Sequence, residues 1–561
     1  MESNLENNIE MPIVVDGEPV MGEVLASPNP YSAILKSLSV KEKSWKSDRD
    51  KKKKKNKGRF KSKSDLQLAQ YDEHLDNFNV LDLNRFDPFM REQSRLREGN
   101  VIPEELKLGL YDESGFFFGM KHEHNIYIGK PAHKDGHILI AGTPGSGKTQ
   151  AIVIPSMMTW SGIQIIIDVK GNLSRHWYGL NKHRGKQLKV FSPGAPKYAS
   201  CGYDPYALFR HDGPNKVVGN ARDLALALMP LLPTVKDPVW VKATQNFLTG
   251  AFIHYFTLGA TFAETMIAIQ KKPLSELLQE IVDDDNFAAM VYVSKLKDVQ
   301  DKVLANIGME LNDLANLVID PALLTSYDAD EQCGLLDWVE LSMATEPFDV
   351  ILEFPEENLE RWQPLLMLMI NQLIKVLERR PERTYKQGKE LPPILVMLDE
   401  FPRLGKVSAI INGLATLRSR GVTFALFVQS WAQLEETYGS ITARVIAEIC
   451  AYKIVLDASD AASQECFSKM TGTTESTQRS VNVNHDPTNG RPTGYGKGIS
   501  EMREPIIYPH EFISQSDVVV ISRHGFFRVD KVQYVDNQKM FMLPQIQASY
   551  AAARGDSVAK M

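Results

Sequence analysis

Cysteine is scarce in this sequence. The 561 residues include four cysteines, Cys201, Cys333, Cys450 and Cys466, and no two of them form a Cys-x-x-Cys pair. This spacing argues against a disulfide framework and against a structural zinc site, both of which need closely spaced cysteines. The cysteine usage favours a reducing environment, and we expect a cytoplasmic protein.

Long apolar runs are also rare. The first ten residues are acidic and polar, whereas a secretory signal needs a basic start and an apolar core. Two uncharged runs are long enough to test as membrane spans, 149–167 and 243–263. We interpret the first as a loop, helix and strand. The second contains Gln245, Asn246 and His254, so a buried helix of a soluble domain is favoured over a membrane span.

The charge is distributed unevenly. The net charge is −6, but residues 41–63 contain 13 Lys and Arg against 3 Asp and Glu, which leaves about −16 for the rest of the chain. We expect residues 1–64 to form a disordered basic tail. Such a segment is either a solvated tail or a contact for nucleic acid or an anionic membrane surface.

Short apolar runs alternate with segments of helix length. This alternation predicts an α/β fold with a mostly parallel sheet flanked by helices on both faces. Residues 473–500, rich in Thr, Ser, Asn and Gly, predict a mobile loop. Two further strands, 518–521 and 526–534, predict a hairpin at the sheet edge. The other predicted strands are 116–118, 137–141, 163–167, 188–191, 350–354, 394–398, 422–428 and 453–456.

Strand patterns disappear between residues 214 and 325. Leucine and isoleucine recur there at helical spacing, for example over residues 274–281 after Pro273. We therefore expect an all-α domain, 214–325, inserted into a nucleotide-binding domain made of two segments. Those two segments are 65–213 and 326–545, and a C-terminal tail covers 546–561.

A phosphate-binding loop is the clearest motif. The sequence GTPGSGKT at 142–149 matches GxxxxGK[ST], follows a predicted strand and begins a predicted helix. Lys148 is expected to reach the β- and γ-phosphates, and Thr149 to coordinate Mg²⁺. The expected nucleotide-binding residues are Gly142, Thr143, Pro144, Gly145, Ser146, Gly147, Lys148, Thr149 and Gln150.

A pair of acids follows the predicted strand 394–398. Asp399 is expected to reach the Mg²⁺ shell, and Glu400 to orient and deprotonate a water molecule. Asp168 also ends a predicted strand, but no second carboxylate follows it, so we expect it to have a supporting role.

Polar residues flank the predicted strand 422–428. Gln429 follows it, and an amide at this strand tip lies beside the γ-phosphate in RecA-like motors; a surface-loop glutamine is the alternative. Arg418 and Arg420 precede the strand. An arginine here could act across a subunit boundary on the transition-state charge, Arg418 before Arg420, or could end a solvated helix.

Taken together, these motifs resemble the type IV secretion coupling proteins, the TraG/TraD-like conjugation ATPases. The resemblance covers about residues 125–540, and its most specific part is 399–439. Its segments are GTPGSGKT with VIPSMMTW (153–160), IIIDVKGN (165–172), GYDPY (202–206), LDEFPRLGKV (398–407), LRSRGVTFALFVQSWAQLEETYG (417–439) and KVQYVD (531–536).

This resemblance implies a RecA-like P-loop motor with an inserted all-α domain that recognises cargo. It implies a homo-hexamer that uses ATP and Mg²⁺, receives a relaxase bound to single-stranded DNA, and passes it to the secretion channel. By the same resemblance, Lys148 and Thr149 hold nucleotide and Mg²⁺, Asp399 and Glu400 are the acid pair, Arg418 is the trans arginine and Gln429 the strand-tip sensor.

Two features depart from the family pattern. Many members carry N-terminal membrane helices, and none is predicted before the motor here, so we expect peripheral association with the inner face of the cell membrane through a separate anchor protein or residues 41–63. Asn172 stands where members often have Glu. Two alternative functions remain open, a nucleotide-gated docking receptor without translocation and a cytoplasmic double-stranded DNA translocase.

Overall fold

The computed structural model describes the part of the chain that carries the motifs. The described residues are 99–108, 114–121, 126–171, 173–174, 176–177, 186–193, 201–231, 238–297, 301–327, 334–382, 385–386, 389–485, 492–513 and 515–534. They all belong to one compact unit, residues 92–561. The predicted tails 1–64 and 546–561 lie outside the described residues, and the division into domains stays a prediction.

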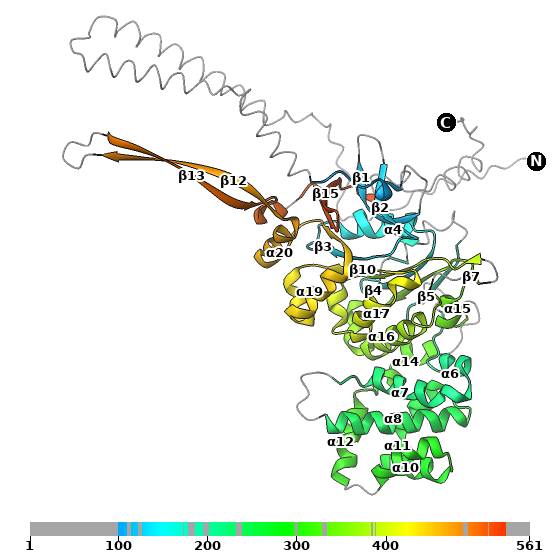
Figure 1. The fold of residues 1–561 in the computed structure, drawn as a ribbon. Helices are drawn as coiled ribbons and strands as arrows, with labels where there is room; N and C mark the ends of the chain where they lie inside the picture. Colours follow the sequence, from blue (N-terminus) through cyan, green and yellow to red (C-terminus); the bar gives the residue numbers. More distant parts are fainter. Residues whose placement is uncertain are drawn as a thin grey trace, which may run out of the picture. The chain divides into compact units, whose positions relative to one another are not determined.

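One large sheet organises this unit (Figure 1). It has 11 strands in the order β2-β1-β15-β14-β11-β3-β10-β9-β4-β6-β5. The strands are β1 Gly115–Lys121, β2 Ile126–Pro131, β3 His137–Ala141, β4 Ile163–Asp168, β5 Leu188–Phe191, β6 Asp349–Glu353, β9 Ile394–Leu398, β10 Val422–Val428, β11 Cys450–Val455, β14 Asp517–Ser522 and β15 Gly525–Asp530. A separate short pair is β7 Tyr385–Lys386 with β8 Lys389–Glu390.

The strands from β11 to β5 are parallel, as predicted from the sequence. The remaining four add antiparallel pairs on the β11 side. The chain inserts β10 between β3 and β9, with Leu426 beside Leu139 and Leu398. Because parallel strands end at one edge of a sheet, the segments after β3, β10 and β9 all emerge side by side.

Both faces of the sheet are buried, which explains why its strands are almost uninterrupted apolar runs. In β10 all seven residues are buried. Phe424 and Leu426 pack into one hydrophobic core, whereas Ala425 and Phe427 pack into the core on the opposite face. Each fully buried Leu or Phe contributes about 1.5–3 kcal/mol, so the central strands are held firmly in register.

Helices cover the two faces. The helices are α4 Ile154–Thr159, α6 Ala207–Asp212, α7 Val217–Leu228, α8 Val239–Thr257, α9 Phe262–Lys271, α10 Leu274–Asp283, α11 Phe287–Lys297, α12 Asp301–Asn312, α13 Asn316–Ile319, α14 Pro321–Leu324, α15 Trp338–Ser342, α16 Glu356–Leu377, α17 Ser408–Thr416, α18 Trp431–Tyr438, α19 Ser440–Ile449 and α20 Ala461–Thr471. In Figure 1, α7, α8, α10, α11 and α12 lie together, and α16 and α17 lie between them and the sheet.

The long uncharged run 243–263 forms most of α8 and the start of α9, and several of its polar groups have hydrogen-bond partners within the helical region. Gln245 Nε2 donates to the Met229 carbonyl at 2.7 Å, and His254 Nδ1 lies 2.8 Å from Asp284 Oδ2. The prediction of a buried helix is therefore confirmed. Within the described ranges, no helix combines the length and the apolar character that crossing a membrane requires.

Two predictions about the C-terminal third are wrong. Residues 473–485 and 492–500 are strand rather than loop, because β12 Thr473–His485 and β13 Pro492–Pro505 pair as an antiparallel hairpin. Their polar composition hid this pairing. The hairpin of β14 and β15 also does not lie at the sheet edge, since β15 pairs with β1 on its other side. It ends at Asp530 rather than at residue 534.

Candidate functional site

The phosphate-loop motif lies between the carboxyl end of β3 and the helix that follows. Gly145 and Gly147 have φ values of +82° and +88°, a left-handed conformation that glycine adopts without steric cost. No described atom lies within 4 Å of the position that a Cβ at Gly145 would occupy. The helix begins with a π-helical turn, Thr149–Val153, in which the Ala151 amide donates to the Gly147 carbonyl at 2.7 Å. The loop therefore presents open backbone at a helix start, where an anion can bind.

Lys148 is folded back over this loop. Its Nζ donates to the Gly142 carbonyl and, at 3.2 Å, to the Thr143 carbonyl. Burial lowers the pKa of Lys148, and Lys170 lowers it further, whereas Glu400, Asp399 and Asp457 act in the opposite direction. The mostly buried Lys148 ammonium group thus interacts electrostatically with the carboxylates of Glu400, Asp399 and Asp457.

Asp457 fixes the start of the loop, and sequence reasoning missed it. The residue follows β11, the strand beside β3. Its Oδ1 accepts a hydrogen bond from the Thr143 amide at 2.6 Å, and its Oδ2 accepts one from the Thr143 hydroxyl at 2.8 Å. An acid after a predicted strand was the available signal, but nothing local indicated that β11 lies next to β3.

The acid pair lies two strands away from β3, at the tip of β9. Neighbouring strands are separated by about 4.8 Å, so β3 and β9 lie roughly 10 Å apart. The Asp399 amide donates to the Ile167 carbonyl of β4 at 3.2 Å, which fixes the turn. Glu400 has φ +57° and ψ +51°, a left-handed conformation that costs an ordinary residue about 1–2 kcal/mol. The backbone therefore turns sharply here and keeps both carboxylates in the site, where both are buried.

Lys170 joins the two acids. Its Nζ lies 2.8 Å from Glu400 Oε1 and 3.8 Å from Asp399 Oδ2. Arg403 Nε lies 3.6 Å from the other Glu400 oxygen. Burial lowers the pKa of Lys170, but the carboxylates of Asp399, Glu400 and Asp168 together raise it. Lys170 belongs to the IIIDVKGN segment, although no role was predicted for it.

Burial raises the pKa of Asp399 to about 6, although Lys170 lowers it. The Asp168 and Glu400 carboxylates add to the increase. Among the described residues, Asp399 Oδ1 is a buried oxygen without a hydrogen-bond partner. A desolvated carboxylate oxygen that accepts no hydrogen bond is well suited to bind a cation, and hard oxygen ligands of this kind suit Mg²⁺.

Asp168 has a different environment. Its Oδ1 accepts hydrogen bonds from the Lys170 and Gly171 amides, both at 2.9 Å, and its Oδ2 accepts one from the Leu173 amide at 2.8 Å. Its carboxylate therefore shapes the turn that carries Lys170. This geometry suits the supporting role predicted for it. Asn172 lies outside the described residues.

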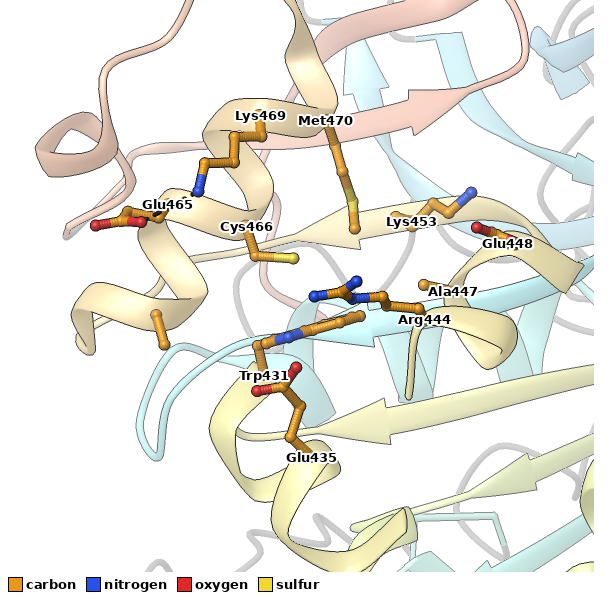
Figure 2. Close-up of a pocket in the computed structure, with 11 residues that line it drawn as sticks. Trp431, Glu435, Arg444, Ala447, Glu448, Lys453, Glu465, Cys466, Lys469 and Met470 are labelled. Carbon is orange, nitrogen blue, oxygen red and sulfur yellow. Dashed lines mark hydrogen bonds and ion pairs between the residues drawn. The ribbon is translucent and has the colours of Figure 1, made fainter. Parts of the chain in front are cut away.

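Gln429 follows β10 and therefore lies between the phosphate loop and the acid pair. Its amide N–H donates to Gln433 Oε1 at 3.3 Å, and the hydroxyl of Ser430 accepts from the Gln433 amide at 3.1 Å. These contacts form the first turn of α18. The next residue, Trp431, lines a pocket of about 580 Å³ between α18, α19, α20 and β11 (Figure 2).

Arg418 is not brought to this site. It lies in a short turn, Arg418–Arg420, before the amino end of β10, whereas the phosphate loop lies beyond the carboxyl ends of the strands. A seven-residue strand spans roughly 20 Å, so this arginine cannot reach the loop of its own chain. Arg418 is exposed, whereas Arg420 donates to the Arg380 carbonyl.

The other predicted loop residues remain within the motif. Ser146 Oγ and Gln150 Oε1 are buried and, among the described residues, have no hydrogen-bond partner. A phosphate loop, a buried lysine and an acid pair thus converge at the carboxyl ends of β3 and β9, which flank β10. This arrangement defines a RecA-like P-loop fold.

Comparison with known proteins identifies the family. Residues 104–555 match the model of the Type IV secretory system Conjugative DNA transfer family, and the chain belongs to this family. The resemblance to the coupling proteins is therefore confirmed. The similar proteins include Conjugal transfer protein TraG of Escherichia coli, 24% identical over 427 residues, covering 69% of this chain and 64% of that protein. Protein VirD4 of Rhizobium rhizogenes is 24% identical over 428 residues, covering 73% and 60%. The chain thus spans less than two thirds of these relatives' length.

Solved structures support the fold. The bacterial conjugative coupling protein TrwB in complex with a non-hydrolysable ATP analogue has a TM-score of 0.55 at 16% identity, covering 79% of this chain and 96% of that one. A trigonal form of the same protein in complex with sulphate has a TM-score of 0.54 and the same coverage.

Proposed function

We propose that this chain is an ATP-hydrolysing coupling protein that recruits a relaxase bound to single-stranded DNA and delivers it to a type IV secretion channel. The observation that carries the proposal is the convergence of Lys148 with Asp399 and Glu400 at the carboxyl ends of β3 and β9, on either side of β10, in a member of the conjugative DNA transfer family. A TrwB structure of the same fold is a complex with an ATP analogue, which supports ATP as a ligand of this fold.

The phosphate loop holds the nucleotide. Amides of residues 142–150 surround the phosphates, and the amino end of the following helix adds partial positive charge. Lys148 exchanges the carbonyls of Gly142 and Thr143 for the β- and γ-phosphates. The partnerless Ser146 hydroxyl and Gln150 amide oxygen lie in the same loop. Thr149 and Asp399 would hold Mg²⁺, which would supply charge neutralisation and polarisation at the γ-phosphate.

Glu400 is the proposed general base. Lys170, 2.8 Å away, pairs with this carboxylate and fixes its direction. Glu400 accepts a proton from a water molecule that it orients for attack. Gln429 lies between the loop and this base, where its amide can respond to loss of the γ-phosphate and transmit the change to α18.

The position of Arg418 is consistent with action across a subunit boundary. The arginine is exposed and precedes the amino end of β10, so it can contact a nucleotide only in a neighbouring copy. An arginine supplied in trans stabilises the charge of the transition state. We propose a homo-hexamer in which each subunit completes the site of the next.

The helical region, proposed as an inserted domain over 214–325, recognises the relaxase and DNA cargo. The motor acts at the inner face of the cell membrane and contacts channel components and a separate membrane anchor protein. Residues 41–63, outside the described part of the chain, are a candidate contact for DNA or anionic lipid.

Steady-state ATP hydrolysis tests the proposal. The chain is assayed without DNA, with single-stranded DNA and with duplex DNA, across salt concentrations. Lys148→Ala and Glu400→Gln are run beside it. Stimulation by single-stranded DNA, lost in both variants, is expected. Intact turnover in Lys148→Ala contradicts the proposal. Bound nucleotide without turnover favours a docking receptor, and preferential stimulation by duplex DNA favours a double-stranded DNA translocase.

A further inference from the structure

A lysine outside every predicted site approaches the phosphate loop. Lys531 begins the KVQYVD segment, which carries part of the family resemblance and has no role in the proposed mechanism. It immediately follows β15. Although Lys531 and Gly147 are far apart in sequence, the structure brings them together.

The strand order explains this approach. β14 runs antiparallel to β11, and β15 runs antiparallel to β14. β15 therefore runs in the same direction as β11 and β3. The residue that follows β15 therefore emerges at the same end of the strands as the phosphate loop that follows β3.

The segment is held on both sides of the lysine. Asp530 ends β15 and pairs with Met120 of β1. Val532 is 4% exposed and packs into a small hydrophobic cluster with Phe117, Met120 and Met158. Because the backbone before and after Lys531 is anchored, its side chain starts from a fixed position.

Lys531 lies directly against the loop. Its Cε is 3.5 Å from the position that a Cβ on Gly147 would occupy, which leaves the ammonium group one bond further on. The side chain is half-buried. No salt bridge or hydrogen bond joins its ammonium group to another described residue. A half-buried cation without a carboxylate beside an anion-binding loop is suited to receive an anion.

We propose that Lys531 is a second phosphate-binding lysine of this site, whose Nζ donates to a phosphate oxygen of the nucleotide held by the loop. This inference rests on the proposed nucleotide-binding function. The ligand class is a nucleoside di- or triphosphate, because the contact is made to the phosphate chain and not to the base. Through Lys531, β15 connects the phosphate site to β1, its neighbour in the antiparallel part of the sheet.

Three variants of the full chain separate charge from packing. Lys531→Met keeps most of the aliphatic stem and removes the charge, Lys531→Arg keeps the charge, and Lys148→Ala tests the nucleotide site itself. Lys453→Met is the matched control, because Lys453 is also half-buried but lies on β11 and lines the pocket between α18, α19 and α20 (Figure 2). Affinity for ATP and ADP is measured by displacement of a fluorescent ATP analogue, with circular dichroism to confirm folding.

We expect Lys531→Met to weaken ATP and ADP binding about ten- to a hundredfold, as loss of one charge-assisted hydrogen bond implies. Lys531→Arg should remain within about threefold of the parent chain, and Lys453→Met should be unchanged. Unaltered affinity in folded Lys531→Met overturns the inference, and so does equal weakening in Lys531→Arg and Lys531→Met. If Lys148→Ala leaves affinity unaltered as well, the nucleotide site itself is wrong.

Discussion

Replacing Asp399 by asparagine should stabilise the protein while removing its function. Burial raises the pKa of this carboxyl from the usual 3.8 to about 6, because the folded state desolvates the charge more than Lys170 compensates for it. Asp399 is 4% exposed, so solvent screens this effect little. A pKa rise of about two corresponds to about 3 kcal/mol, by which the ionised carboxylate destabilises the folded state at neutral pH.

The pH dependence follows from the sign of that change. Between pH of about 4 and 6 the folded chain binds a proton that the unfolded chain has lost, so this group's destabilising effect develops as the pH rises through that window. Above pH 6 the effect is complete. Asp399→Asn should therefore be more stable than the parent chain by about 3 kcal/mol at pH 7.5, and the difference should disappear near pH 4.

Urea unfolding followed by circular dichroism measures the difference, with EDTA present so that no divalent cation occupies the site. Asp168→Asn is the matched control, because Asp168 ends β4, the strand beside β9. Its carboxylate accepts three backbone N–H bonds, and an amide cannot accept all of them. Burial raises the pKa of Asp168 as well, but the lost backbone hydrogen bonds cost about 1–3 kcal/mol, so this variant should gain less stability than Asp399→Asn or lose it. Equal stability of Asp399→Asn and the parent chain at pH 7.5 would refute the reasoning, as would a gain that persists at pH 4.

Adding Mg²⁺ and ATP provides an independent readout. A ligand that binds only the folded state stabilises it by about 2.7 kcal/mol at a concentration 100 times its Kd. The parent chain should gain stability with Mg²⁺ and ATP together, whereas Asp399→Asn should gain only what ATP gives without Mg²⁺. The same Mg²⁺-dependent gain in both chains would show that Asp399 does not hold the metal.

Two further predictions follow from the site. Asp457→Ala removes the acceptor of two hydrogen bonds from Thr143, at 2.6 and 2.8 Å, and should weaken nucleotide binding about tenfold or more because the loop loses its anchor. Thr143→Val retains the bond from the backbone amide and should lose less affinity. Displacement of a fluorescent nucleotide measures both, and equal affinity of Asp457→Ala and the parent chain contradicts the role. Arg418→Ala should leave nucleotide affinity unchanged but lower turnover at least a hundredfold. Mixing it with inactive Glu400→Gln subunits should restore some hydrolysis, because one variant supplies the glutamate and the other the arginine of a shared site. Failure of mixing to restore any hydrolysis would argue against a trans arginine.

Local sequence patterns predicted the motor core well. The strands at 137–141, 188–191, 394–398 and 422–428 occur with the predicted bounds. For the three central ones, 137–141, 394–398 and 422–428, the reason is that a strand buried on both faces must be a continuous apolar run. The phosphate loop was predictable for a related reason. Its glycines, lysine and threonine must lie at fixed spacing in one short segment for the backbone to surround a phosphate.

The β12–β13 hairpin was not predictable in the same way. Strands β12 and β13 pair with each other and with no other described strand, so they lie outside the large sheet, where burial on both faces requires apolar runs. Their Thr, Ser, Asn and Gly content is also typical of loops. Backbone pairing between two polar segments leaves little trace in composition.

The chemistry of the individual segments can be read from the residues alone: a phosphate-binding loop, an acid pair after a buried strand, and an amide after another strand. Which of these segments meet depends on the three-dimensional fold. The insertion of β10 between β3 and β9, the clamp from Asp457, and the arrival of Lys531 at Gly147 depend on strand order and direction. Arg418 and Gln429 are close in sequence but separate in space, because they lie at opposite ends of strand β10. Strand order is set by packing of both faces over the whole chain, and no local window of sequence contains that information.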